Sequence, residues 1–240
     1  MCKYIICFLT VSPCELFYNF SKTLKNNNTD VYICIDNNNY DIPNYDNYIN
    51  IIKLDNHLCE EAGFKSSVLW LDNKSCSRDK ALYYFCKNNL EYEYIWFIEE
   101  DVFIPSIHTI ENINNKYNTG DLLTSGNDII YEKKYDWHWN HINNQIKIPP
   151  PYGVSAICAI RCSKKIMDCI HDYANKYNNL FMDEALFNTL AIQNNLNIIC
   201  PNELSSIVWR RNWIKNDILE SNLYHPIKDI QTQYNYRNNE

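Results

Sequence analysis

The chain alternates short apolar segments with amphipathic and asparagine-rich ones. Residues 3–10 and 30–36 are apolar runs of strand length, and their last residues, Thr10 and Asp36, are polar. Between them, large apolar side chains recur at helical spacing over 16–24. A strand, a helix and a second strand in this order form the repeating unit of a sheet with right-handed crossovers, so the pattern predicts an α/β fold.

The segment between these two strands carries residues that begin helices. Ser12 is a suitable N-cap, Pro13 fits the first helical position, and Glu15 follows three residues after Ser12. A helix is therefore expected to start at Pro13. Residues 48–54 are predicted to form a weaker third strand.

An apolar run over 94–98 leads directly into the acids Glu99, Glu100 and Asp101, after which 102–104 are apolar again. The run is too short for a helix and fits a strand buried on both faces. Three adjacent unpaired carboxylates are too costly to bury, so we expect them where this strand reaches solvent. A hard divalent cation with oxygen ligands would relieve their repulsion. An acidic turn exposed to solvent is the alternative interpretation.

Two predicted helices bring further charged residues toward this edge of the sheet. The helix over 75–90 precedes the acidic strand and must run antiparallel to it, which places Arg78 and Lys80 near the acids, together with the positive helix terminus. Such an arrangement suits a phosphate ester. In the helix over 180–192, Asp183 and Glu184 occupy the first turn, where acids either stabilise the helix dipole or act as a general base.

Aromatic and histidine residues supply the remaining candidates. Trp137, Trp139 and Tyr152 are expected to stack on a sugar or another flat ligand, or else to pack their loop onto the domain. His138 and His141 lack a third ligand at a suitable spacing for a zinc site. His225 precedes a proline and is either a nitrogen ligand of a metal or an ordinary surface histidine. Further strands are predicted over 121–126, 154–161, 196–200 and 207–209.

Composition narrows the function classes. A length of 240 residues suits one domain, and a net charge of −7 argues against nucleic acid as the partner. The apolar runs are too short to form a transmembrane segment, and the first run reads as a strand and not as a signal peptide. Eleven cysteines, an odd number without a CxxC pair, favour a reducing compartment, so we expect a cytoplasmic protein. The abundance of Asn, Ile, Lys and Tyr suggests an AT-rich coding genome, such as that of a large DNA virus or an AT-rich protist.

The order of these features resembles glycosyltransferases of the GT-A fold. The triplet 99–101 is similar to their DxD motif, and especially to its Glu-Asp-Asp form, although Glu100 stands where that form has Asp. The resemblance implies a Rossmann-type mixed, mainly parallel sheet flanked by helices, in a single domain over 1–240. Residues 1–104 would bind the nucleotide sugar, and 105–240 would form the acceptor-binding half and the C-terminal tail.

The resemblance also implies an activity. A hexosyl- or N-acetylhexosaminyltransferase would move a sugar from a nucleotide-sugar donor, a UDP-sugar, to a hydroxyl of a glycan or glycoprotein with inversion. Asp101 and His225 would coordinate Mn²⁺ or Mg²⁺, and Asp183 or Glu184 would be the base. The nucleotide sugar would be held by Thr10, Asp36, Arg78, Glu99 and Glu100, and the acceptor by Trp137, Trp139 and Tyr152.

Other interpretations remain at this stage. Some GT-A enzymes work without metal through basic residues, for which Arg210, Arg211 and Lys228 are candidates. A sugar nucleotidyltransferase would be expected to carry a glycine-rich phosphate loop after the first strand, and the chain has only 4 glycines, none of them there. A noncatalytic carbohydrate-binding or scaffold protein on the same fold is the third alternative.

Overall fold

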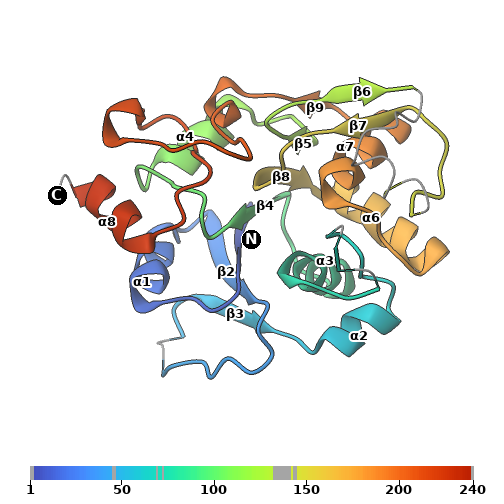
Figure 1. Ribbon diagram of the computed structural model, residues 1–240, viewed down its shortest axis with the longest axis horizontal. Coiled ribbons are helices and arrows are strands. Elements are labelled where there is room, and N and C mark those ends of the chain that lie inside the picture. The colour runs from blue at the N-terminus through green and yellow to red at the C-terminus, as the bar shows by residue number, and fades with distance from the viewer. Residues whose placement is uncertain are drawn as a thin grey trace.

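The computed structural model describes residues 3–44, 47–68, 70–71, 73–131, 142 and 145–238. Its centre is a seven-stranded sheet with the order β3-β2-β1-β4-β8-β5-β9 (Figure 1). The strands are β1 (Tyr4–Thr10), β2 (Thr29–Ile35), β3 (Asn50–Lys53), β4 (Tyr94–Glu99), β5 (Leu122–Leu123), β8 (Ala159–Ser163) and β9 (Ile198–Ile199). Strands β3, β2, β1 and β4 are parallel, β8 is antiparallel to both β4 and β5, and β9 is parallel to β5. The predicted fold class, a mixed and mainly parallel sheet with flanking helices in one domain, is confirmed.

Helices cover both faces of this sheet. They are α1 (Glu15–Thr23), α2 (Asn56–Glu61), α3 (Ser77–Lys87), α4 (Thr109–Lys116), α6 (Lys164–Tyr177), α7 (Asp183–Gln193) and α8 (Ile230–Asn238). Side chains of β1 alternate between two apolar clusters because successive strand residues point to opposite faces. One cluster packs on α3, α6 and α7 and the other on α1 and α4, which lie on opposite sides of the sheet in Figure 1.

The register of the parallel strands determines where polar side chains gather. Thr10 pairs with Ile35 at the end of β2, and Leu9 pairs with Glu99 at the end of β4. The carboxyl ends of β1, β2 and β4 therefore meet at one edge of the sheet. Ligands of open α/β sheets bind at such an edge, beyond the carboxyl ends of the strands.

The first helix begins two residues later than predicted. Cys14 is its N-cap, in an extended conformation, in place of Ser12. The Val11 carbonyl accepts a hydrogen bond from the backbone of Asn37, and the Pro13 carbonyl accepts one from the Tyr40 hydroxyl. Because the chain after β1 contacts the segment after β2, helical turns start only at Glu15.

The predicted strand over 154–161 is broken in the middle. Its first part belongs to β7 (Tyr152–Val154), which pairs with β6 (Asp128–Ile130) in a separate ribbon, and its last part belongs to β8. Between them the Ser155 N–H donates to the Glu184 carbonyl at 3.0 Å, so the chain turns toward the start of α7. The strand predicted over 207–209 is reduced to one bridge, between Ile207 and His225.

No helix in the described part of the chain is long and apolar enough to span a bilayer.

Candidate functional site

A cavity of about 360 Å³ lies at the carboxyl edge of β1 and β4. It contains seven of the residues that the sequence singled out. Six are Thr10, Arg78, Glu99, Glu100, Asp101 and Asp183. The seventh is Lys228, from the segment before α8. The cavity therefore combines four carboxylates with a buried guanidinium and an ammonium group.

Arg78 is the central cation of this cavity. It stands in the first turn of α3 and is only 2% exposed. Its Nη2 lies 2.7 Å from Glu99 Oε1, and its Nε lies 2.8 Å from Asp183 Oδ2. Burial lowers the pKa of Arg78, but the charges of Asp183 and Glu99 outweigh burial and raise it above its usual value. The guanidinium is thus permanently charged, and its buried Nη1 has no hydrogen-bond partner among the described residues.

Asp183 and Glu184 have different surroundings at the start of α7. Asp183 is 8% exposed, and burial raises its pKa to about 7 against the opposing charge of Arg78. Glu184 is less buried, and its Oε1 accepts a hydrogen bond of 2.7 Å from Trp209 Nε1. Burial raises the pKa of Glu184 as well, and the Trp209 bond opposes that rise. Asp183 therefore forms an ion pair with Arg78, whereas Glu184 accepts one hydrogen bond from the Trp209 indole.

Thr10 and Glu100 form a direct pair, in which the Thr10 hydroxyl donates to Glu100 Oε2. Burial raises the pKa of Glu100, and the hydrogen bond from Thr10 opposes this rise. The Glu100 carbonyl accepts a bond of 2.9 Å from Gln233 of α8. A side chain of the C-terminal helix α8 thus holds the backbone of the acidic triplet in place.

Asp36 lies beside Lys80 at the end of β2. The Lys80 ammonium is fully buried, donates to Asn38 Oδ1 at 2.7 Å and lies 3.9 Å from Asp36 Oδ1. Burial raises the pKa of Asp36, and the charge of Lys80 opposes that rise. Lys80, expected near the acidic triplet, contacts the end of β2 instead, so this edge carries a second positive group.

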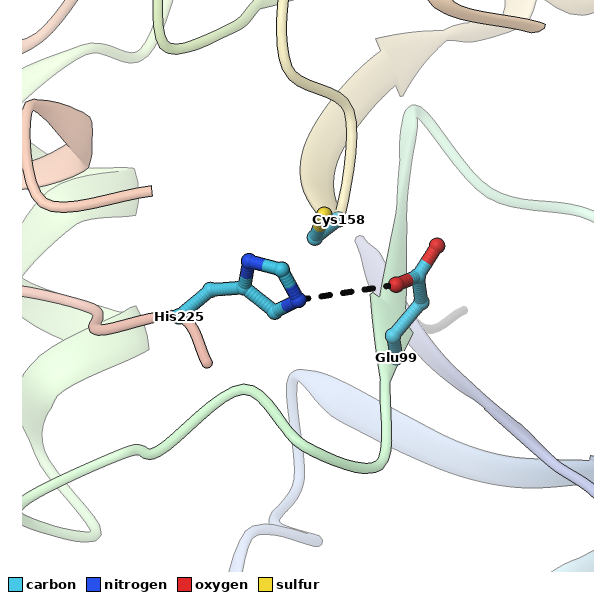
Figure 2. A group of neighbouring side chains, drawn as sticks. All are labelled: Glu99, Cys158 and His225. Atoms are coloured by element: carbon cyan, nitrogen blue, oxygen red, sulfur yellow. Dashed lines mark ion pairs between the residues drawn. The ribbon is translucent and has the colours of Figure 1, made fainter. Parts of the chain in front are cut away.

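His225 reaches the acidic triplet from the C-terminal segment. Its Nδ1 lies 2.6 Å from the Val208 carbonyl, and its Nε2 lies 3.4 Å from Asp101 Oδ1 and 4.0 Å from Glu99 Oε2, the contact drawn in Figure 2. Burial lowers the pKa of His225, but the hydrogen bond and charge of Asp101 outweigh burial and raise it. The structure therefore brings together Asp101 and His225, which are 124 positions apart in the printed numbering.

Cys158 is a member of the site that the sequence did not indicate. Its sulfur, a Glu99 carboxylate oxygen and a His225 ring nitrogen all lie within 4.8 Å of one another (Figure 2). In the sequence Cys158 lies in an apolar run and reads as a small core residue. Strand pairing places Cys158 beside Glu99, because β8 runs antiparallel to β4 and the Glu99 N–H donates to the Cys158 carbonyl at 2.8 Å.

The chemistry of these groups fits a divalent cation. Glu99 and Asp101 offer carboxylate oxygens and His225 offers an imidazole nitrogen, a donor set that suits Mn²⁺ and, less well, Mg²⁺. Glu99 has one oxygen fixed by Arg78 and the other facing His225. The site can therefore hold a metal beside a fixed positive charge.

A second hollow, of about 800 Å³, lies next to this cavity. Its wall contains Trp209, Arg210, Arg211 and Trp213, and Lys228 lines both hollows. The Arg211 guanidinium lies 4.0 Å from the centre of the Trp213 ring. We call this hollow the Trp209 groove; it is basic and aromatic, whereas the cavity is mainly acidic.

The structure describes only one of the three residues predicted to hold an acceptor. Trp137 and Trp139 lie outside the described residues. Tyr152 is in the apolar core, 1% exposed, and its hydroxyl donates to the Ile148 carbonyl at 3.0 Å. A ring with no exposed face cannot stack on a sugar, so the structure places Tyr152 in the packing of β7 and not at a binding surface.

No protein-family model and no curated protein matches the chain. Among solved structures, 4-diphosphocytidyl-2C-methyl-D-erythritol synthase from Anaerococcus prevotii aligns with 82% of this chain and 86% of its own at 10% identity and a TM-score of 0.44. Mouse xyloside xylosyltransferase 1, in its apo form, aligns with 83% of this chain and 84% of its own at 11% identity and a TM-score of 0.41. A glycosyltransferase involved in glycosylation of the major capsid of PBCV-1 aligns with 75% and 67% at 12% identity and a TM-score of 0.28. At such identities and TM-scores, none of these similarities assigns a family or a function to the chain.

Proposed function

We propose that the protein is a metal-assisted glycosyltransferase that moves a sugar from a nucleotide-sugar donor, a UDP-sugar, to an acceptor hydroxyl of a glycan or glycoprotein. The observation that carries this proposal is the cavity in which Arg78, the triplet 99–101 and Asp183 meet, with His225 against Asp101. A nucleotide diphosphate needs positive charge beside it, and a metal needs carboxylates. The cavity provides both at the edge where α/β sheets bind ligands.

In this proposal the diphosphate leaving group lies against Arg78. The unpartnered Nη1 offers a donor for a phosphate oxygen, and Lys228 lines the same cavity. Asp101 and His225 would hold Mn²⁺ or Mg²⁺, which when bound supplies further positive charge for the departing diphosphate. Thr10 fixes Glu100, and Lys80 fixes the end of β2 beside Asp36, where the nucleoside would be held.

Glu184 is the general base of the proposed reaction. Its single bond from Trp209 leaves its other oxygen available, whereas Oδ2 of Asp183 is paired with Arg78 in a nearly dry environment. The pKa of Glu184, raised by burial, brings it closer to neutral pH, where a base works best. The acceptor would lie in the Trp209 groove, whose aromatic rings can stack on sugar faces. A hydroxyl attacking from the groove while diphosphate leaves toward Arg78 gives inversion.

In this proposal the predicted donor-binding half, 1–104, and acceptor-binding half, 105–240, both contribute to the donor site. Residues 1–104 supply Thr10, Arg78 and the triplet, while 105–240 supply Asp183, His225 and Lys228 to the same cavity. The donor site thus uses both halves, and the acceptor groove belongs to the second. The rival nucleotidyltransferase has less support, because β1 is followed by Val11, Ser12 and Pro13 and not by a glycine-rich loop.

A thermal-shift experiment tests the proposal. The purified chain is heated with a panel of nucleotide sugars, with and without Mn²⁺. A donor at about 100 times its dissociation constant adds about 2.7 kcal/mol to the free energy of unfolding and raises the Tm. We expect one donor to raise the Tm in the presence of metal, and transfer to an acceptor or slow hydrolysis to follow. A folded protein with no shift for any donor, with or without Mn²⁺, would contradict the proposal and favour the noncatalytic interpretation.

A further inference from the structure

Three kinds of metal-binding atom converge at one point of the cavity edge. Glu99 offers an oxygen from the end of β4, Cys158 a sulfur from the residue before β8, and His225 a nitrogen from the C-terminal segment (Figure 2). Their donor atoms lie within 4.8 Å of one another, and Cys158 and His225 are each 7% exposed. Among the described residues no other group of His, Cys, Asp and Glu side chains meets this condition.

His225 is oriented as a metal ligand. A carbonyl oxygen only accepts hydrogen bonds, so the contact of 2.6 Å to Val208 requires Nδ1 to carry the proton. The other nitrogen, Nε2, then faces Glu99 and Asp101. Histidines that bind metals usually donate their second nitrogen to a carbonyl or carboxylate in this way, because it fixes the tautomer and the ring orientation.

Glu99 and Cys158 are held just as firmly. Glu99 Oε1 is 2.7 Å from Arg78, which directs Oε2 toward His225. The Cys158 carbonyl accepts the Glu99 N–H at 2.8 Å, and the next residue, Ala159, pairs with Ile98 in the sheet. The Cys158 backbone, one residue before β8, is therefore held beside Glu99 at the point where the pairing of β4 and β8 begins.

We propose that Cys158 is a ligand of the metal centre, and that the centre binds a cation of the Zn²⁺ class in preference to Mg²⁺. Sulfur, nitrogen and one carboxylate oxygen form a set that Zn²⁺ and Co²⁺ accept and that Mg²⁺ disfavours. On binding, the Cys158 S–H bond is replaced by a sulfur–metal bond, and the proton leaves to solvent. Tetrahedral coordination at a zinc–sulfur distance of about 2.3 Å and a zinc–nitrogen distance of about 2.0 Å needs donor atoms about 3.6 Å apart, so no pair of donor atoms has to approach by more than about 1.2 Å.

Glu99, Cys158 and His225 supply three of the four ligands of a tetrahedral Zn²⁺ site. Asp101, whose Oδ1 is 3.4 Å from the same histidine nitrogen, is placed to supply the fourth and to yield it to water or substrate. The inference deepens the proposed function by naming the class of metal at its site. Metal binding by Cys158 can be tested without any assumption about activity, whereas a role of this metal in sugar transfer rests on the proposed function.

Cobalt alone is the probe that tests the ligand set, because Co²⁺ bound to a thiolate absorbs in the near ultraviolet through sulfur-to-metal charge transfer. The full chain in reduced form is titrated with Co²⁺ in the absence of any nucleotide sugar. We expect a charge-transfer band that saturates at one Co²⁺ per chain. One equivalent of Zn²⁺ should remove the band, whereas a large excess of Mg²⁺ should leave it.

Cys158→Ser should abolish this band and weaken Co²⁺ binding at least about tenfold. Cys200→Ser, which changes an exposed thiol in the same way, should keep it. His225→Ala provides a second ligand variant and should shift or abolish the band if Cys158→Ser fails to fold, with circular dichroism checking each fold. A wild-type chain without the band, or a band unchanged in folded Cys158→Ser or His225→Ala, would overturn the proposal. Because no donor is present, these outcomes are separate from those of the thermal-shift test.

Discussion

The Arg78 Nε lies 2.8 Å from Asp183 Oδ2, and this contact joins the first turn of α3 to the first turn of α7. The two helices are separated by about half the chain, yet both begin at the edge where β1 and β4 end. Arg78 also contacts Glu99 at 2.7 Å, so one buried cation balances two carboxylates. Arg78 offsets the repulsion between the carboxylates of the cavity and so stabilises the folded state.

Replacing Arg78 by methionine should therefore destabilise the protein. The change keeps much of the side-chain volume but leaves Asp183 and Glu99 without their partner, and removing one member of a buried ion pair costs about 3 to 5 kcal/mol. Urea unfolding at pH 8, above the value of about 7 to which burial raises the pKa of Asp183, measures the loss. Arg237→Met serves as a control for the loss of a partly buried guanidinium without a carboxylate partner among the described residues. A loss at Arg78 below about 1 kcal/mol would mean that the pair contributes little.

The stability of the wild-type chain should fall as the pH rises through the range in which Asp183 ionises. Burial raises the pKa of Asp183 to about 7 in the folded state, whereas an unfolded aspartate titrates near 4. Between these values the folded state holds more protons than the unfolded state, so the contribution of this group is complete below pH 4 and lost as the pH rises through 7. Asp183→Asn cannot titrate and should remove this part of the slope. Equal slopes from pH 4 to 7 in both proteins would show that Asp183 is ionised throughout.

The strand and helix pattern allowed the fold to be predicted, because continuous apolar runs marked β1, β2 and β4, which are buried on both faces of the sheet. The parallel pairing of β1 with β2 and β4 brings Thr10 and the acidic triplet to one edge of the sheet, where Arg78 contacts Glu99. Two local predictions were wrong: α1 starts later than predicted, and the predicted strand over 154–161 is interrupted. Both depend on contacts between segments far apart in the sequence, such as the bond from Ser155 to the Glu184 carbonyl, which no local pattern reveals.

The candidate site shows the same limit. Asp101 and His225 were expected to meet, and the two atoms involved lie 3.4 Å apart. Cys158 was missed because an apolar run conceals which of its residues faces Glu99 until the pairing of β8 with β4 is known. Tyr152 was expected at a surface but is buried. The prediction was wrong because an aromatic residue beside a proline-rich loop has the same sequence pattern whether it binds a ligand or packs in the core.

Metal dependence should disappear when Asp101 is changed to alanine. This residue is partly exposed at the cavity, so its loss removes a metal ligand without opening a void in the core. We expect an unchanged Tm without ligand and no further Tm increase when Mn²⁺ is added with the donor. EDTA should have the same effect on the wild type. Asp168→Ala, on the exposed surface of α6, is the control for removal of one carboxylate and should keep the metal-dependent shift. A shift of wild-type size in Asp101→Ala would show that Asp101 is not needed to bind the metal.

Changing Glu184 to glutamine should separate binding from transfer. The amide oxygen still accepts the hydrogen bond from Trp209, so the structure and the donor-induced Tm shift should persist, while the base that removes the acceptor proton is lost. General bases contribute about 10²- to 10⁴-fold to the rate, and kcat should fall by that factor with little change in KM for the donor. Single-turnover transfer kinetics measure it.

Trp209→Phe is the companion variant, because it keeps an aromatic ring in the groove but removes the indole N–H that holds Glu184. We expect a smaller loss of kcat than in Glu184→Gln, and a pH–rate profile whose acidic limb moves. The Trp209 bond holds the pKa of Glu184 below the value that burial alone would give, so its loss should shift that limb toward higher pH. Trp213→Phe alters the same groove at an indole that donates to the His225 carbonyl, and should leave the limb in place. If Glu184→Gln retains wild-type kcat, the base lies elsewhere, and Asp183 becomes the residue to test.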